Sequence, residues 1–224
     1  MIVLRRVTLL TPDRRGHILD RQDLVIGDRD RVGVLAPSGS GRSSIARLLC
    51  GVDTPHSGEV LSAGRVSWPL GYAGFLHPDL TVRRNVEHLS DLTGFPPDPA
   101  LRIACWLCGD MAVPERRVSS LTQGQRGLVA EACGFGFPAD HYVADEKLLF
   151  GDERAQARGA ALLRRRLTSA GLILLSRNPN TIEQWCTRIF TLVRACLVPC
   201  DSINMARSVL ERAQAANVQK EENS

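Results

Sequence analysis

The stretch that most constrains the fold lies at residues 32–49. Residues 32–35 are apolar, residues 36–41 are small or turn-forming, and residues 43–49 carry apolar side chains at helical spacing. This order predicts a buried parallel strand, a tight turn and a helix. Glycines let successive backbone N–H groups face an anion, and the helix N-terminus adds partial positive charge. The stretch therefore predicts a phosphate-binding loop; the alternative is an ordinary glycine- and serine-rich turn.

The predicted loop departs from the usual phosphate-loop pattern at two positions. Ala36 stands where the first glycine is expected, and Arg42 stands where a lysine usually reaches the terminal phosphates. Gly39 and Gly41 fit the pattern, and so do the hydroxyls of Ser43 and Ser44, at the place where a hydroxyl usually holds Mg²⁺.

The overall composition is that of an ordinary globular chain. Of the 224 residues, 44% are apolar and 23% are charged, which suits one large α/β domain. The net charge of +4 is compatible with anionic ligands or a membrane surface. No basic stripe interleaved with aromatics occurs, so we expect no nucleic acid partner. No apolar run of about 18 residues exists and no signal peptide is recognised, so we expect no membrane span.

The cysteines predict free thiols. There are seven of them, and an odd, scattered set in a chain without a secretion signal is typical of reduced cysteines. Cys105 and Cys108 have the spacing of a metal or redox pair, but they lie in an apolar helical run without a second pair nearby, so we expect them to serve packing.

Alternation of strand and helix patterns predicts an α/β fold with a mainly parallel sheet and helices on both faces. The N-terminal strands are expected to be antiparallel, with an edge strand at 2–10. Strands are expected at 2–10, 18–26, 32–35, 59–62, 141–146, 172–175 and 189–198, and helices at 43–50, 81–92, 100–108, 119–134, 153–169 and 181–186; residues 67–81 read as loop. We expect one domain over 1–200 with an inserted helical subdomain at 78–118, and a C-terminal helix and frayed tail at 201–224.

Two acids follow the apolar strand predicted at 141–146. A phosphate loop needs a carboxylate at the end of a neighbouring strand to hold Mg²⁺, and Asp145 supplies one. Glu146 could polarise an attacking water as a general base. The alternative is a pair of solvated acids at a strand end.

With these motifs in order, the sequence resembles the ATP-binding subunit of an ABC transporter, and within it the subfamily that exports capsular polysaccharide. The resemblance covers residues 1–190. It is carried by the phosphate loop, the string at 51–58, the Ser-Trp-Pro string at 67–69, the segments at 80–86 and 121–126, the acid pair, and the string at 176–182. It implies a P-loop NTPase fold of the ABC type.

In that family two subunits enclose two ATP molecules, each phosphate loop facing the partner's signature segment. The resemblance assigns ATP to Ala36, Pro37, Ser38, Gly39, Ser40, Gly41, Arg42, Ser43 and Ser44, and to the signature residues Thr122, Gln123, Gly124 and Gln125. It implies Mg²⁺ at Ser43, His77 and Asp145, catalytic roles for Glu146, Arg177 and His77, and a dimer-interface place for Asp152.

The departures from the family pattern concern nucleotide handling. Arg42 replaces the phosphate lysine, His77 replaces a glutamine that senses Mg²⁺, and Arg177 replaces the switch histidine. No Tyr, Phe or Trp lies between Leu9 and Leu24, where the family stacks an aromatic ring on adenine, and His17 is a weak substitute.

The first hypothesis is therefore an ATP-hydrolysing subunit that powers export of capsular or related polysaccharide. It would lie on the cytoplasmic face of the inner membrane, bound to a membrane-spanning permease, as a homodimer or a heterodimer. The alternative is a catalytically weakened pseudo-ATPase with a structural or regulatory role in such a transporter. A P-loop kinase or small GTPase is a third, weaker reading, because neither a lid nor an Asn-Lys-x-Asp motif is present.

Overall fold

The computed structural model describes residues 1–221, with the side chains of residues 1–216. Its larger sheet has six strands in the order β5-β6-β7-β3-β8-β9. The first five are parallel and β9 is antiparallel to β8, so the expected mainly parallel sheet is confirmed. The strands are β3 (Arg31–Leu35), β5 (Val66–Pro69), β6 (His141–Asp145), β7 (Gly171–Ser176), β8 (Arg188–Val193) and β9 (Cys196–Cys200).

The smaller sheet is antiparallel and holds the N-terminal strands. Its order is β2-β1-β4, with β1 (Ile2–Leu10), β2 (His17–Ile26) and β4 (Ser57–Ser62). The expectation that residues 2–10 form an edge strand was wrong, because β1 pairs on one side with β2 and on the other with β4. The second pairing joins Ile2 to Ser62, and contacts that far apart in the chain leave no mark on a local pattern.

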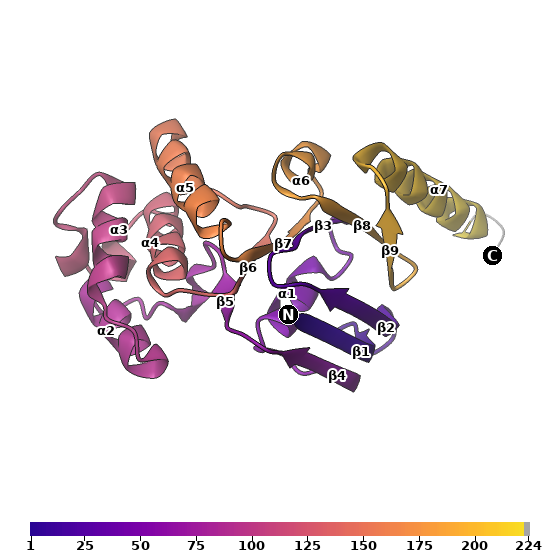
Figure 1. Cartoon of the computed structure of the whole chain (residues 1–224), viewed down its shortest axis with the longest axis horizontal. Coiled ribbons are helices and arrows are strands. Elements are labelled where there is room, and N and C mark those ends of the chain that lie inside the picture. Colours follow the sequence, from indigo (N-terminus) through magenta and orange to yellow (C-terminus); the bar gives the residue numbers. More distant parts are fainter. Residues whose placement is uncertain (222–224) are drawn as a thin grey trace.

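The six-stranded sheet is covered on both faces (Figure 1). On one face, α1 (Arg42–Leu49) and the three-stranded sheet enclose a core that includes Ile45, Leu48 and Val34. On the other face lie α5 (Glu153–Arg166), α6 (Pro179–Trp185) and α7 (Ile203–Glu221). Residues 32–35 of β3 and 171–175 of β7 are apolar and buried, as strands covered on both faces require.

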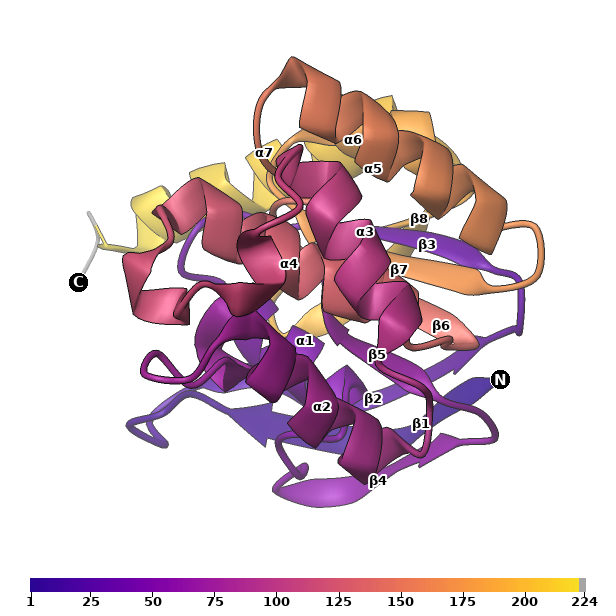
Figure 2. The same ribbon diagram turned by 90° about the vertical axis from the view of Figure 1, so that its left-hand side faces the viewer.

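A cluster of helices stands beside the sheet and has its own core (Figure 2). It contains α2 (Val82–Thr93), α3 (Asp98–Cys108) and α4 (Gln123–Gly136), with short 3₁₀ turns at Val113–Glu115 and Val118–Ser120. Thr81 caps α2, accepting a hydrogen bond from the Arg84 backbone N–H at 3.2 Å. The boundaries expected for the helical subdomain, 78–118, stay a prediction, as does the division at residue 200.

Two local expectations were wrong. Residues 67–81 are not all loop, because β5 extends the sheet beside β6 and a 3₁₀ turn follows at Ala73–Phe75. Residues 189–198 are not one strand, because β8 and β9 form a hairpin that turns at Arg194 and Ala195, both with positive φ. Of the expected frayed tail, residues 222–224 lie outside the described residues. Among the described helices, none is long and apolar enough to cross a membrane.

Candidate functional site

The predicted phosphate loop connects β3 to α1 and has a backbone that only glycine accommodates at key points. Gly39 and Gly41 have φ of 78° and 92°, a left-handed conformation that costs other residues free energy. A Cβ at Gly41 would also lie 2.4 Å from Cγ2 of Ile18 on β2. The small sheet therefore packs directly against the loop and requires glycine there.

The loop presents free backbone donors. Within the described chain, the N–H groups of Gly39, Gly41, Ser43 and Ser44 donate no hydrogen bond, whereas the next N–H, that of Ile45, donates to the Gly41 carbonyl at 3.0 Å. Unpaired N–H groups at the start of a helix are the donors that bind phosphate elsewhere. This geometry favours an anion site over an ordinary turn.

Two oxygen-bearing side chains meet at the start of α1. The Ser43 hydroxyl donates a hydrogen bond to Asp145 Oδ2. They come together because β3 and β6 are both hydrogen-bonded to β7, so the carboxyl ends of these parallel strands share one edge of the sheet. No group of three or more His, Cys, Asp or Glu side chains that could hold a metal occurs in the described part of the chain. A hydroxyl and one carboxylate nevertheless fit Mg²⁺, which takes one or two protein oxygens and completes its shell with phosphate and water.

Arg42 and Glu146 form an ion pair at the mouth of the loop. The Arg42 side chain is 12% exposed, and its Nη1 also donates to the Ala36 carbonyl at 3.0 Å. The guanidinium therefore ties the first residue of the loop to the acid that directly follows β6. Arginine is suited to this because its planar fork can serve two acceptors at once.

Arg177 holds the other side of the same carboxylate. Its Nε lies 3.3 Å from Glu146 Oε1, and its backbone N–H donates to Oε2 at 3.3 Å. Glu146 itself has φ of 66°, a left-handed backbone conformation directly after the end of β6. The two arginines that the sequence analysis singled out are thus brought together on one acid.

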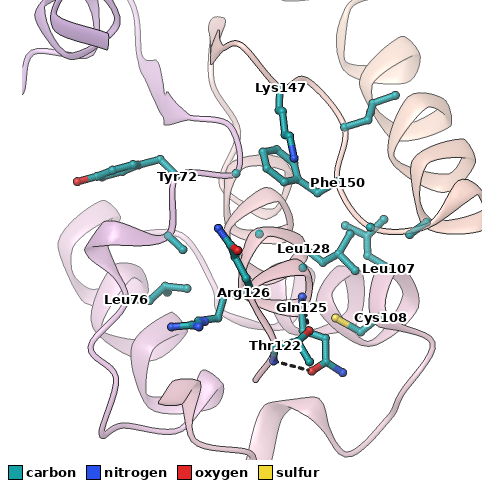
Figure 3. Close-up of a pocket in the computed structure, with 18 of the residues that line it drawn as sticks. Tyr72, Leu76, Leu107, Cys108, Thr122, Gln125, Arg126, Leu128, Lys147 and Phe150 are labelled. Carbon is teal, nitrogen blue, oxygen red and sulfur yellow. Dashed lines mark hydrogen bonds between the residues drawn. The ribbon is translucent and has the colours of Figure 1, made fainter. Parts of the chain in front are cut away.

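The signature residues begin α4 and line a different cavity. Thr122 and Gln125 form a capping box, in which the Gln125 backbone N–H donates to Thr122 Oγ1 at 3.2 Å and the Thr122 N–H donates to Gln125 Oε1 at 3.1 Å (Figure 3). With Gln123 and Gly124 they border a cleft of about 1290 Å³. None of residues 36–44 lines this cleft. In the isolated chain, the signature segment and the phosphate loop are therefore separate.

The hydrogen bonds of His77 are made with its own segment and with α2. Its ring Nδ1 accepts a hydrogen bond from the Asp79 backbone N–H at 3.3 Å, and its backbone pairs with the side chain of Asn85. Among the described residues, no hydrogen bond or ion pair joins it to Ser43 or Asp145. Its expected metal-binding and catalytic roles stay predictions.

Phe150 is a residue that the sequence analysis missed. Its ring lies between Gly71 and Gly127, where an added Cβ would come within 1.9 Å and 2.7 Å of the ring respectively. It borders the signature cleft on the same side as Lys147 (Figure 3). The ring thereby connects three chain segments, at 71–78, 122–128 and 147–156, and the only sequence signal for it is the pair of glycines that make room.

Glu131 was also missed. It lies on α4, is fully buried, and neither carboxyl oxygen has a hydrogen-bond partner among the described residues. Burial raises the pKa of this carboxyl to about 8. A Cβ at Gly159 on α5 would lie 2.4 Å from its Oε1, so the acid is enclosed where α4 meets α5.

None of the cysteines forms a disulfide in the structure. All seven are free, and Cys105 is buried in the helical cluster with its Sγ 3.8 Å from the Met111 carbonyl oxygen. Burial raises the pKa of Cys108 to about 11, and no metal-binding group includes either residue in the described chain.

The fold and this site define a phosphate-loop nucleotide-binding domain of the α/β class. Known proteins are similar to it, and two relatives by sequence illustrate this. The polysialic acid transport ATP-binding protein KpsT of Escherichia coli is 24% identical over 180 residues, 79% of this chain and 80% of that protein. The cytochrome c biogenesis ATP-binding export protein CcmA of Brucella abortus is 30% identical over 176 residues, 74% of this chain and 80% of that protein.

Among solved structures, the dimeric ATP-binding cassette MJ0796 bound to ADP and Pi superimposes with a TM-score of 0.74 at 20% identity, covering 88% of this chain and 96% of that one. A comparison with protein-family models found no match. The chain belongs to the family of ATP-binding proteins of ABC transporters.

Proposed function

We propose that this chain is the ATP-hydrolysing subunit that powers export of a capsular or related polysaccharide across the cytoplasmic membrane. The observation that carries the ATPase part is the meeting of the phosphate loop with Asp145 and Glu146 at one edge of the sheet. The similarity to KpsT, named as a polysialic acid transport protein, supports the cargo class.

In this proposal, the free N–H groups between Gly39 and Ser44 bind the phosphates of ATP. Ser43 and Asp145 hold Mg²⁺, which neutralises charge that develops on the phosphates. An entering terminal phosphate competes with Glu146 for the Arg42 guanidinium, and Arg177 supplies a second positive charge. Glu146, once released from Arg42, accepts a proton from the attacking water as the general base.

The separate signature cleft supports a second nucleotide-binding subunit. Thr122, Gln123, Gly124 and Gln125 line a cavity away from their own phosphate loop, so in the proposal they complete the ATP site of a partner, as a homodimer or a heterodimer. The proposed assembly includes a membrane-spanning permease, and the chain lies peripherally on the cytoplasmic face of the inner membrane.

The test is ATP cleavage in a single turnover by the purified protein together with its permease. We expect Glu146→Gln to lower the rate at least 100-fold, a typical contribution of a general base. Glu183→Gln, an exposed acid on α6, is the matched control and leaves the rate unchanged. A wild-type rate no higher than that of Glu146→Gln overturns the ATPase proposal and favours the non-hydrolysing subunit.

Nucleotide affinity is measured separately by titration with and without Mg²⁺. We expect Asp145→Asn to remove most of the dependence of affinity on Mg²⁺, because it removes a charged oxygen ligand. A wild-type dissociation constant weaker than about 1 mM, or about −4 kcal/mol, contradicts an ATP-driven cycle. Transport of labelled polysaccharide into vesicles that carry the permease tests the proposed class of cargo. If ATP is cleaved but the polysaccharide is not transported, the proposed cargo class is wrong and the ATPase proposal stands.

A further inference from the structure

The helices α3 and α5 are neighbours (Figure 2). Side chains from both line a groove that the proposed mechanism does not use. Its volume is about 510 Å³. Ile103 and Trp106 from α3 and Leu162 from α5 form its apolar lining, and Trp106 is 45% exposed. An exposed tryptophan beside partly buried aliphatic side chains is typical of recognition surfaces.

Arginines border this apolar lining on both helices. Arg102 projects from α3, and Arg165 and Arg166 project from the last turn of α5. Arg158 lies over the Trp106 ring, 5.7 Å from guanidinium carbon to ring centroid. We call these four arginines and the apolar lining the α3–α5 groove.

These positive charges lack negative partners. In the described part of the chain, none of the four arginines forms an ion pair with a carboxylate. Arg158 and Arg166 donate instead to backbone carbonyls, those of Trp106 and Phe135. Asp98 stands one turn before Arg102 on α3, but it does not pair with it. The groove therefore combines an apolar floor with uncompensated positive charge.

We infer that the α3–α5 groove binds an acidic, amphipathic helical segment of a partner protein. The lining spans residues 99–106 of α3, about 10 Å or two helical turns, which matches a segment with apolar side chains at i and i+3 or i+4. Carboxylates beside those anchors meet the guanidinium groups, whose fork geometry suits carboxylate oxygens. A concave apolar floor favours such a segment over the flat surface of an anionic membrane.

The experiment uses the full chain and a dye-labelled synthetic helical peptide that carries leucines at i and i+3/i+4, flanked by glutamates. Binding is followed by fluorescence anisotropy at low salt. We expect saturable binding that weakens at least 10-fold in the double variant Arg102→Glu/Arg165→Glu and at least 5-fold in Trp106→Ala. The control Arg29→Glu/Arg212→Glu makes the same change of net charge at exposed arginines outside the groove, and we expect less than a 2-fold effect.

Thermal unfolding of each variant is measured alongside, and the neutral pair Arg102→Gln/Arg165→Gln, expected to weaken binding at least 3-fold, replaces the reversal if the latter unfolds. The proposal is overturned if the wild type does not bind the peptide, or if both charge-reversed pairs weaken binding equally. It is also overturned if vesicles of phosphatidylglycerol bind the chain through Arg102 and Arg165 while the peptide does not, which assigns the groove to a lipid surface.

Discussion

The buried acid Glu131 makes the stability of this protein depend on pH in a direction opposite to that of a paired surface acid. Its carboxyl is enclosed between α4 and α5 without a hydrogen-bond partner in the described chain, and burial raises its pKa from 4.5 to about 8. Between these values the folded state keeps a proton that the unfolded state has released. Because the unfolded state then binds fewer protons, the free energy of unfolding falls as pH rises.

The magnitude follows from that difference in pKa. One bound proton corresponds to about 1.4 kcal/mol per pH unit, so the contribution lost between pH 4.5 and pH 8 is about 4–5 kcal/mol at most. Below pH 4.5 the carboxyl is protonated in both states and the penalty is absent. Above pH 8 it is ionised in both states and the penalty is complete.

The perturbation that isolates this effect is Glu131→Gln, which keeps the size of the side chain and removes its titration. We expect the unfolding free energy of the variant, relative to wild type, to rise by about 2–3 kcal/mol between pH 5.5 and pH 7.5. Urea unfolding at several pH values measures it, and Glu183→Gln at an exposed position serves as control. Parallel curves for wild type and Glu131→Gln would refute the reasoning.

Further predictions concern the loop, the signature helix and the thiols. In urea titrations, Gly41→Ala should lower the free energy of unfolding by more than about 1–2 kcal/mol, because a left-handed φ of 92° is combined with a contact of 2.4 Å between the added Cβ and Ile18. The same variant should abolish nucleotide binding. Gly51→Ala, where φ is 71° but the space around the residue is open, should lower the free energy of unfolding less. Thr122→Ala removes the N-cap and capping box of α4 and should lower the unfolding free energy by about 1 kcal/mol; an unchanged midpoint contradicts this. A thiol-reactive dye on the native protein should label one equivalent, at the exposed Cys196, and Cys196→Ser should remove that labelling.

The local elements of the site could be read from the sequence because their signals act over a few residues. Glycine at 39 and 41 predicts a tight turn, and the apolar run at 32–35 predicts a strand buried on both faces. The helix expected from residue 119 begins instead at Gln123, because Thr122 and Gln125 form a capping box there. The order of these elements along the chain also predicted the meeting of Ser43 with Asp145, since the carboxyl ends of parallel strands share one edge.

What the sequence by itself determined is therefore the strand, loop and helix order and the family resemblance. The tertiary structure decided which partners distant residues take: β1 between two strands, Arg42 on Glu146, and Phe150 between Gly71 and Gly127. It also decided that Glu131 is enclosed without a partner and that arginines of α3 and α5 border one groove. Such contacts join residues far apart in the chain, so their free energies depend on packing that no local pattern encodes.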